Sequence, residues 1–367
     1  MFRSKRSSFV RKLWQNRCGV ASATGSRSVD SGQNGEESHC ALKPAAYSLF
    51  QKMKDEQLEL LAKAVESKGA WESSCVCFPK ADLRVGKHVL PPLVLICKLF
   101  RWPDLKQLHE LKRLSWCETF WKTGNEGTVV CCNPFHLSRL LVPETPPPPY
   151  SKAVLFEKQK TDFIECFDGR EQGSSDSCSF THTDQHDTTL SRNTIKDGYW
   201  CKVAYWEHRT RVGRLYSAHE LSVNIFSDLP QGNGFCLGQL NTEHRNEIVK
   251  RTRSKIGQGI ILSQEEDGVW VYNRSDHPVF VNSPTLDIPY SRTFSVHKVM
   301  SGYSIKVFDF EKSVVLQHLT SQCGRNDGPY DPNSIRISFA KGWGPCYSRQ
   351  FITSCPCWLE VLLNTSR

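Results

Sequence analysis

The sequence predicts an α+β protein in which a small domain of helices and short strands precedes a larger β-sandwich. Two observations lead to this order. Helical periodicity and short apolar runs dominate residues 45–142, whereas period-2 apolar runs separated by Gly, Pro, Asn and Asp turns dominate residues 199–367. Residues 143–198 begin with a proline run and then carry Ser, Thr, Asp and His without an apolar face, so we expect a linker there.

The first domain is expected to begin with helices. Apolar residues recur at helical spacing over residues 45–68, and Gly69 follows them, which predicts an amphipathic helix or a helix pair closed by a glycine cap. Before it, residues 1–44 combine a basic amino terminus with a stretch rich in Ser, Gly, Glu and Asn at 21–40. For these we expect a localisation signal or solvated tail followed by a flexible segment. Short apolar runs then follow at 75–78, 93–100 and 129–132.

The second domain carries the alternation typical of strands half-buried in a sandwich. Two helical stretches, at 243–255 and 310–319, interrupt the alternation and are expected at the ends of the sandwich. The expected strands are residues 200–206, 212–216, 223–226, 269–272, 279–281, 335–339 and 358–363.

Composition excludes some classes of protein. The chain has 367 residues, of which 39% are hydrophobic. Its longest mostly apolar stretch, 89–97, is interrupted by Pro91 and Pro92 and is shorter than the roughly 18–20 residues of a membrane span. No apolar core of a secretory signal follows the basic amino terminus, so we expect an intracellular protein. The formal net charge of +9 favours acidic partners, whether nucleic acid, phosphorylated protein or anionic lipid.

No catalytic constellation is recognisable, and we expect that the protein is not an enzyme. The glycines at 232, 234 and 238 are spaced one residue too widely for a dinucleotide-binding loop, and there is no P-loop. His182 and His186 lie beside Asp184 and Asp187 in the expected linker, where a mobile chain would not hold catalytic geometry.

Thiols and a histidine form the clearest candidate metal site. Cys117, Cys131, Cys132 and His136 combine thiolates with an imidazole, which is the donor set that tetrahedral Zn²⁺ prefers, and Cys75 is available as a fourth ligand. The alternative is a group of buried free cysteines, since Cys is among the most buried residue types. Four protein ligands would leave no open position, so a bound metal would be structural.

Several motifs resemble a known family. Residues 97–105, CKLFRWPDL, and 131–136, CCNPFH, resemble the amino-terminal Mad-homology domain of Smad proteins. Residues 200–216, 228–238 (DLPQGNGFCLG) and 341–344 (KGWG) resemble their carboxy-terminal Mad-homology domain, a SMAD/FHA-like β-sandwich. Within the family, the chain most resembles the inhibitory Smads of the BMP-antagonising type. The resemblance implies one structural Zn²⁺ in the first domain, held by Cys75, Cys117, Cys131 and His136.

The resemblance also bears on DNA. Smads that bind DNA read the major groove with a β-hairpin, which corresponds here to residues 80–92. This hairpin is shorter, and Gly86 stands where a base-contacting Gln would be expected. Arg84 and Lys87 could contact phosphates, which provide affinity without sequence selectivity. We therefore expect weak or non-specific DNA binding, or an ordinary solvated turn.

A proline–tyrosine motif lies at the start of the linker. Pro147, Pro148, Pro149 and Tyr150 match P-P-x-Y, and a run of prolines holds the chain in the polyproline II conformation that WW domains bind. A proline-rich spacer is the alternative. In Smads this motif recruits WW-domain HECT-type ubiquitin ligases, and the resemblance implies the same partner here.

Basic residues gather in the second domain. Lys250, Arg251, Arg253 and Lys255 crowd one expected helix, whereas Lys341 and Arg349 flank a loop at 342–348 that Gly and Pro residues are expected to keep open. Composition alone favours a solvated face. The resemblance implies that four of these residues bind phosphoserines and activated type I receptors. These four are Arg251, Lys255, Lys341 and Arg349.

These expectations combine into one function and one alternative. The favoured function is an inhibitory adaptor of BMP and TGF-β signalling that binds activated type I receptors and phosphorylated receptor-regulated Smads, and that recruits ubiquitin ligases. The last residues, 363–367, lack the Ser-x-Ser tail of activating Smads, so we expect binding without activation. The alternative is a nuclear DNA-binding transcriptional co-repressor, with co-repressors as partners. Either function implies a protein of the cytoplasm and nucleus.

Overall fold

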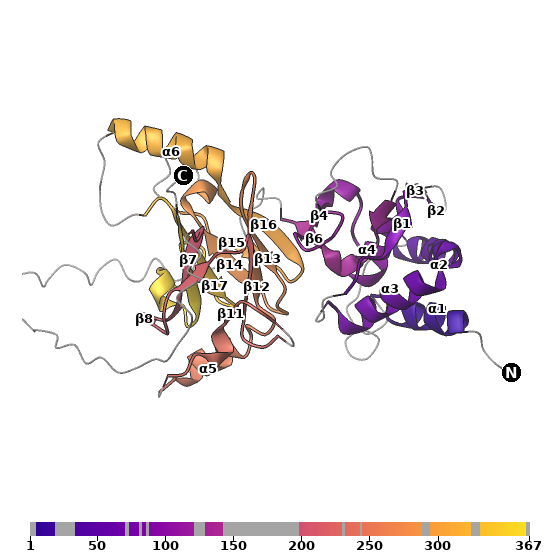
Figure 1. Ribbon diagram of the computed structural model, residues 1–367, viewed down its shortest axis with the longest axis horizontal. Helices are drawn as coiled ribbons and strands as arrows, with labels where there is room; N and C mark the ends of the chain where they lie inside the picture. The colour runs from indigo at the N-terminus through magenta and orange to yellow at the C-terminus, as the bar shows by residue number, and fades with distance from the viewer. Residues whose placement is uncertain are drawn as a thin grey trace, which may run out of the picture.

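The computed structural model contains two packed domains, and it confirms the expected α+β class (Figure 1). Helices α1 to α4 gather at one end of the molecule, and a β-sandwich with α5 and α6 forms the other end. The structure describes residues 5–18, 34–69, 73–80, 83–85, 88–120, 129–141, 198–229, 232–242, 244–287, 294–323 and 331–364. Within this part of the chain, no helix combines the length and the apolar character that crossing a membrane requires.

The first domain consists of four helices and six short strands. The helices are α1 (Lys5–Gln15), α2 (Asn34–Lys52), α3 (Asp55–Ser67) and α4 (Pro92–Phe100). The strands are β1 (Cys77–Pro79), β2 (Leu83–Val85), β3 (His88–Leu90), β4 (Leu111–Arg113), β5 (Val129–Cys131) and β6 (Leu137–Leu140). Antiparallel pairing joins β1 to β5 and β2 to β3. Two 3₁₀ turns, Leu108–Glu110 and Pro134–His136, precede β4 and β6.

Helix α3 shows why this stretch of the chain is helical. The Gln57 side chain accepts a hydrogen bond from the Lys54 backbone N–H at 2.7 Å, which satisfies one donor at the helix start. The helix ends at Lys68 in the left-handed conformation. Gly69 follows with φ of +76°, and a Cβ there would meet the Phe135 ring, so the site needs glycine. The helix pair expected over residues 45–68 is present.

Helix α1 differs from the expected solvated tail. Leu13 is only 1% exposed and belongs to the core of the first domain, where α1 packs against α3. Apolar residues at 9, 10, 13 and 14 recur at helical spacing and form the face of the helix that packs on the core. In the sequence, the many basic residues around them hide this pattern. Lys12 pairs with Glu66 of α3 at 3.1 Å. Helix α2 likewise begins at Asn34, inside the segment expected to be flexible.

The second domain is a sandwich, and six of the seven expected runs are strands in it. Its first sheet runs in the order β15, β14, β17, β18, β7, β8, with β9 also on β7. These strands are β7 (Cys201–Glu207), β8 (Thr210–Arg211), β9 (Tyr216–Ala218), β14 (Val279–Asn282), β15 (His297–Val299), β17 (Ser334–Phe339) and β18 (Trp358–Leu363). Helices α5 (Glu247–Arg253) and α6 (Phe310–Cys323) lie within the two stretches expected to be helical or extend slightly beyond them.

The second sheet runs in the order β11, β10, β12, β13, β16, β6, β4. The strands from the second domain are β10 (Ser222–Phe226), β11 (Phe235–Cys236), β12 (Ile260–Glu265), β13 (Gly268–Asn273) and β16 (Tyr303–Asp309). Residues between the sheets form one apolar core, in which Val203, Ile225, Leu262 and Ile337 are fully buried. The remaining 3₁₀ turns are Leu237–Gln239, Pro284–Leu286 and Ile352–Ser354.

Two details of the sandwich were predicted incorrectly. The strand expected at 212–216 is absent, because the chain turns at Gly213, whose φ of +79° is incompatible with a strand. The short strands β8, β9, β11 and β15 were not expected, and neither were the longer strands β12 and β16. Both β12 and β16 contain a buried serine, Ser263 or Ser304, in place of an apolar residue, which interrupts the apolar run that would mark a strand.

The two domains share one sheet. Strand β6 of the first domain pairs in parallel with β16 of the second, with Arg139 N–H donating to Gly302 O at 3.1 Å and Leu141 N–H donating to Ser304 O at 2.8 Å. Lys112 belongs to β4, the strand beside β6. Its Nζ pairs with the Glu265 carboxylate at 2.5 Å and lies 4.2 Å from the centre of the Trp270 ring. Both charged side chains are less than 20% exposed, so water screens this pair little.

The packing of α1 predicts that Leu13→Ala destabilises the first domain by about 2–5 kcal/mol, because the truncation leaves a cavity between α1 and α3. Urea unfolding followed by tryptophan fluorescence measures this change. Arg11→Ala, at an exposed position of the same helix, is the control and should change stability by less than about 0.5 kcal/mol. Equal unfolding midpoints for the two variants would show that α1 does not belong to the domain core.

Candidate metal centre and partner-binding surfaces

Four separate segments of the first domain bring the expected metal ligands together. Cys75 lies just before β1, Cys117 follows β4, Cys131 ends β5, and His136 ends the 3₁₀ turn after it. One ligand atom from each residue lies within 4.8 Å of the other three. The pairing of β1 with β5 sets Cys77 opposite Cys131, which brings the first and third segments side by side.

The distances fit a tetrahedral ion. The Cys75 Sγ lies 3.7 Å from the Cys117 Sγ and 3.4 Å from the His136 Nδ1, and the Cys131 Sγ lies 3.5 Å from that nitrogen. Bonds of about 2.3 Å to sulfur and about 2.0–2.1 Å to nitrogen place tetrahedral ligand atoms roughly 3.5–3.8 Å apart. Three thiols and an imidazole at these separations can therefore hold one ion of this geometry.

Neighbouring groups orient the histidine. Its Nε2–H donates to the Ser73 carbonyl oxygen at 2.7 Å, which leaves the lone pair of Nδ1 directed toward the thiols. Asn133 holds this turn in place, because its side-chain oxygen accepts from the Phe135 N–H at 3.0 Å and its amide donates to the Ser74 carbonyl at 3.1 Å. Sequence reasoning did not single out Ser73 or Asn133. Asn133 lies inside the recognised CCNPFH motif, whereas Ser73 contributes only a backbone carbonyl, which no side chain reveals.

The thiols do not share one protonation state. The hydrogen bond from the Cys131 thiol lowers the pKa of Cys117 to about 3, with help from His136 and Thr119. Donating that hydrogen bond raises the pKa of Cys131, and burial raises the pKa of Cys75 to about 11. An ion that binds all three cysteines as thiolates must displace the protons of the thiols whose pKa is raised, Cys75 and Cys131.

The alternative of buried free thiols holds for other cysteines. Cys97 and Cys132 are fully buried in the apolar cores of the first domain, and neither lies in the four-residue cluster. Burial raises the pKa of each to about 12, so both remain protonated and unreactive.

Both domains match known families. Residues 42–141 match the MH1 domain family, and residues 198–364 match the MH2 domain family. The chain belongs to the Smad family. The order of the two domains, the cysteine–histidine cluster in the first and the sandwich in the second confirm the resemblance found in the motifs.

Individual relatives refine the assignment. The chain is 57% identical to mothers against decapentaplegic homolog 6 of Gallus gallus over 331 residues, which cover 89% of this chain and 76% of that one. It is 47% identical to homolog 7 of Homo sapiens over 88% of this chain and 78% of that one. Dwarfin sma-3 of Caenorhabditis elegans is 30% identical over 80% and 78% of the respective chains. Similarity to homologs 6 and 7 identifies this Smad as one of the inhibitory group in BMP and TGF-β signalling.

The β-hairpin expected from the family is present but short. Strands β2 and β3 have three residues each, and they pair from Leu83 opposite Leu90 to Val85 opposite His88. Gly86 and Lys87 at its tip lie outside the described residues.

The basic residues near α5 divide into two groups. Arg253 is drawn inward, where it donates to Glu207 at 3.1 Å and to the Leu237 carbonyl at 2.7 Å, and Arg245 also pairs with Glu207. Lys250 pairs with Glu247 on the same helix. No ion pair joins any of the four predicted binding residues to an acid in the described part of the chain. These four are Arg251, Lys255, Lys341 and Arg349.

The loop that carries two of these cations is closed, contrary to the open loop expected from its Gly and Pro residues. Trp343 is 2% exposed and packs among Phe280, Val296, Cys355 and Trp358, which holds the loop against the sandwich. The Gly344 N–H donates to the Arg349 carbonyl at 2.7 Å and narrows the loop further. Burial of one large aromatic side chain outweighs the flexibility of its glycine neighbours.

Residues 355–357 connect the loop that carries Lys341 and Arg349 to the helix region that carries Arg251 and Lys255. The Cys355 thiol donates to the Lys341 carbonyl at 3.6 Å, and the positive charge of Arg349 opposes the rise that burial causes in the pKa of that thiol. Two residues later, the Cys357 thiol lies 3.9 Å from the Val249 carbonyl of α5. The loop and α5 therefore pack on opposite ends of residues 355–357.

The proline–tyrosine motif at Pro147–Tyr150 lies outside the described residues, so its role stays a prediction.

The cluster predicts one zinc ion for each chain, measured by elemental analysis of the purified protein. Cys117→Ser should lose the ion, whereas Cys346→Ser, at an exposed cysteine far along the chain, should retain it. Protons compete with the metal for thiols whose pKa is raised, so affinity should fall as the pH falls, which a chelator competition series measures. Retention of the ion by Cys117→Ser would contradict the assigned ligand set.

Proposed function

We propose that this Smad is a non-catalytic inhibitory adaptor that binds activated type I receptors and phosphorylated receptor-regulated Smads through its second domain. The observation that supports this most is the set of cations without a carboxylate partner among the described residues: Arg251, Lys255, Lys341 and Arg349. They lie in the part of the chain that matches the MH2 family. Their neighbours Arg245 and Arg253 instead pair with Glu207, so these two charges stabilise the domain itself.

The chemistry suits a phosphorylated partner. A phosphoserine carries close to two negative charges and three acceptor oxygens, and Arg and Lys side chains bind these with charge-assisted hydrogen bonds. The cations at 341 and 349 stand on a loop that Trp343 holds against the core, so little conformational freedom is lost on binding. An unphosphorylated partner would offer these cations no charge to pair with. A protein that binds in this way obstructs the same site for activating Smads.

Charge reversal tests the site. The double variant Lys341→Glu, Arg349→Glu should weaken binding of the full chain to a phosphorylated type I receptor kinase by at least about 30-fold, because each lost charge-assisted hydrogen bond contributes about 1.5–3 kcal/mol. Surface-immobilised receptor, with and without phosphorylation, measures the affinity. Unphosphorylated receptor should bind weakly and respond little to the variant.

The matched control is Arg211→Glu, Lys312→Glu, which makes the same change of net charge at exposed positions of the same domain. It should leave binding to the phosphorylated receptor within about threefold of the unmodified chain, as the loss expected from long-range charge alone is small at physiological salt. An equal loss in both double variants would mean that net charge, and not a site around residue 341, governs binding.

The proposal includes a second partner. Pro147–Tyr150 match the P-P-x-Y ligand of WW domains, and the motif falls between the two matched domains, at 142–197. We expect it to recruit HECT-type ubiquitin ligases to whatever the second domain binds. Binding and recruitment together would both block and remove an activated receptor. Such a role places the protein in the cytoplasm and the nucleus, where receptors' cytoplasmic domains and Smads occur.

Tyr150→Ala should abolish capture of a WW-domain ligase by the full chain, because the tyrosine ring fills one of the two grooves that read this motif. Pull-down with the isolated WW domains measures the loss. Tyr150→Phe retains the ring and should lose much less, and zinc content should be unchanged in both variants. Capture that is insensitive to Tyr150→Ala would remove the ligase from the proposal and leave receptor binding untouched.

The metal centre has a structural part in this function. Zinc, if bound by Cys75, Cys117, Cys131 and His136, would have four protein ligands and no position open for substrate. It would hold together four chain segments that meet beside α3 and α4.

A further inference from the structure

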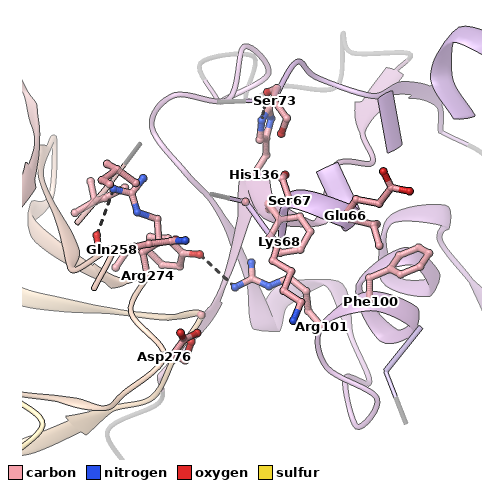
Figure 2. Close-up of a pocket in the computed structure, with 18 of the residues that line it drawn as sticks. Glu66, Ser67, Lys68, Ser73, Phe100, Arg101, His136, Gln258, Arg274 and Asp276 are labelled. Atoms are coloured by element: carbon pink, nitrogen blue, oxygen red, sulfur yellow. Dashed lines mark hydrogen bonds between the residues drawn. The ribbon is translucent and has the colours of Figure 1, made fainter. Parts of the chain in front are cut away.

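A cavity of about 810 Å³ lies where the two domains meet (Figure 2). Its lining comes from α3 and α4 on one side and from the sandwich on the other, and the volume is in the range that suits a small organic molecule. Nothing in the receptor-binding proposal or in the metal centre requires this space.

One wall of the cavity belongs to the first domain and carries three cations, Arg17, Lys68 and Arg101. Arg101 donates to the Pro134 carbonyl at 3.0 Å and to the Tyr272 hydroxyl at 3.2 Å, which spans the two domains. A turn of the second domain approaches it closely at Gly302, where a Cβ would collide with the guanidinium. Carbonyl and hydroxyl oxygens orient this group but do not neutralise its charge.

The other two cations of this wall, Arg17 and Lys68, also keep their positive charge without a carboxylate partner among the described residues. Arg17 donates to the Trp14 carbonyl at 2.6 Å and lies 4.2 Å from the centre of the Trp14 ring, so it too has partners that leave its charge intact. Lys68 is exposed at the left-handed end of α3. Arg101 and Lys68 both lie close enough to Cys18 to oppose the rise that burial causes in the pKa of its thiol. In the described part of the chain, no ion pair joins Arg17, Lys68 or Arg101 to a carboxylate.

The facing wall belongs to the second domain and contributes Arg274, which Figure 2 shows across the cavity from Lys68 and Arg101. Arg274 donates to the Asn224 side-chain oxygen at 3.2 Å, and that interaction fixes its direction. Cations on both walls therefore face one space.

On the wall of the first domain, acidic residues do not balance the charge of Arg17, Lys68 and Arg101. The acidic residues among the described lining residues are Glu66 and Asp276. Glu66 already pairs with Lys12, which lies outside the lining, at 3.1 Å, and Asp276 is exposed at the rim. Serine hydroxyls complete the donor set, at residues 67, 73, 222 and 301. The cavity thus presents an excess of positive charge together with neutral donors.

We propose that this cavity binds a small molecule that carries two or more phosphate groups. Guanidinium groups bind phosphate oxygens in pairs, and hydroxyl groups donate to the remaining oxygens. A ligand with a single carboxylate carries one negative charge, which is too little to pair with cations on both walls. Because the ligand contacts both domains, it binds the docked arrangement alone and stabilises it in proportion to its concentration.

Calorimetric titration of the full chain tests the proposal with three probes: pyrophosphate, ATP and inositol hexakisphosphate. At least one probe should bind at a single site with a Kd below about 100 µM. Tighter binding of ATP than of the inositol phosphate would identify a nucleotide as the class of ligand, and the reverse order would identify an inositol polyphosphate. Citrate, a polyanion without phosphate, should bind at least tenfold more weakly than the best probe.

Two variants locate the site. Lys68→Glu on one wall and Arg274→Gln on the other should each weaken binding of the best probe at least fivefold. Lys312→Glu and Arg211→Gln make the same changes of charge at exposed positions away from the cavity, and each should leave affinity within twofold. Unchanged zinc content and an unchanged thermal unfolding midpoint without ligand show that a variant has folded, and Lys68→Arg should restore binding.

Three results would overturn the proposal. The first is that no probe binds with a Kd below about 100 µM, and the second is that citrate binds as tightly as the phosphates. The third is that the variants at 68 and 274 weaken binding no more than their controls do, which would indicate general attraction to a basic protein.

Discussion

The shared sheet is the constraint on which the arrangement of the two domains depends. Strand β16 would be an edge of the sandwich, with a row of backbone donors and acceptors left without partners. Strand β6 covers the start of this edge, where the Arg139 and Leu141 N–H groups donate to the Gly302 and Ser304 carbonyls, and β4 extends the sheet by one more strand. Once β6 is in place, Lys112 reaches Glu265 and Trp270, and the cavity between the domains has its two walls.

Inside the first domain, an ion bound by the cysteine–histidine cluster would compensate for short strands. Strands β1 and β5 have three residues each, too few to form a stable sheet by themselves. The four ligands come from segments separated by up to 61 residues in the chain, as the contact between Cys75 and His136 shows. An ion that joined such distant segments at one point would give the domain a fixed geometry that its small sheets alone would not provide.

In the second domain, burial divides one group of basic residues into two functions. Glu207 is 9% exposed and needs positive partners, and Arg245 and Arg253 supply them from α5 and the residues before it. Arg251 and Lys255, a few residues away, have no acidic partner among the described residues. Basic residues close together in the chain therefore differ in role, because Arg245 and Arg253 stabilise the fold by pairing with Glu207 and the other two do not.

The sequence by itself determined the fold class, the helix pair of the first domain and half of the strands of the sandwich, and together with the family resemblance it determined the four residues of the metal cluster. These depend on local periodicity or on motifs, which are written in consecutive residues. Only the tertiary structure decided that α1 belongs to the core, that the loop at 342–348 is closed by Trp343, that Arg253 points inward, and that a cavity with cations on both walls lies between the domains. Each of these depends on contacts between residues far apart in the chain, such as Leu13 on α3 or Arg101 on Tyr272, which no local pattern encodes.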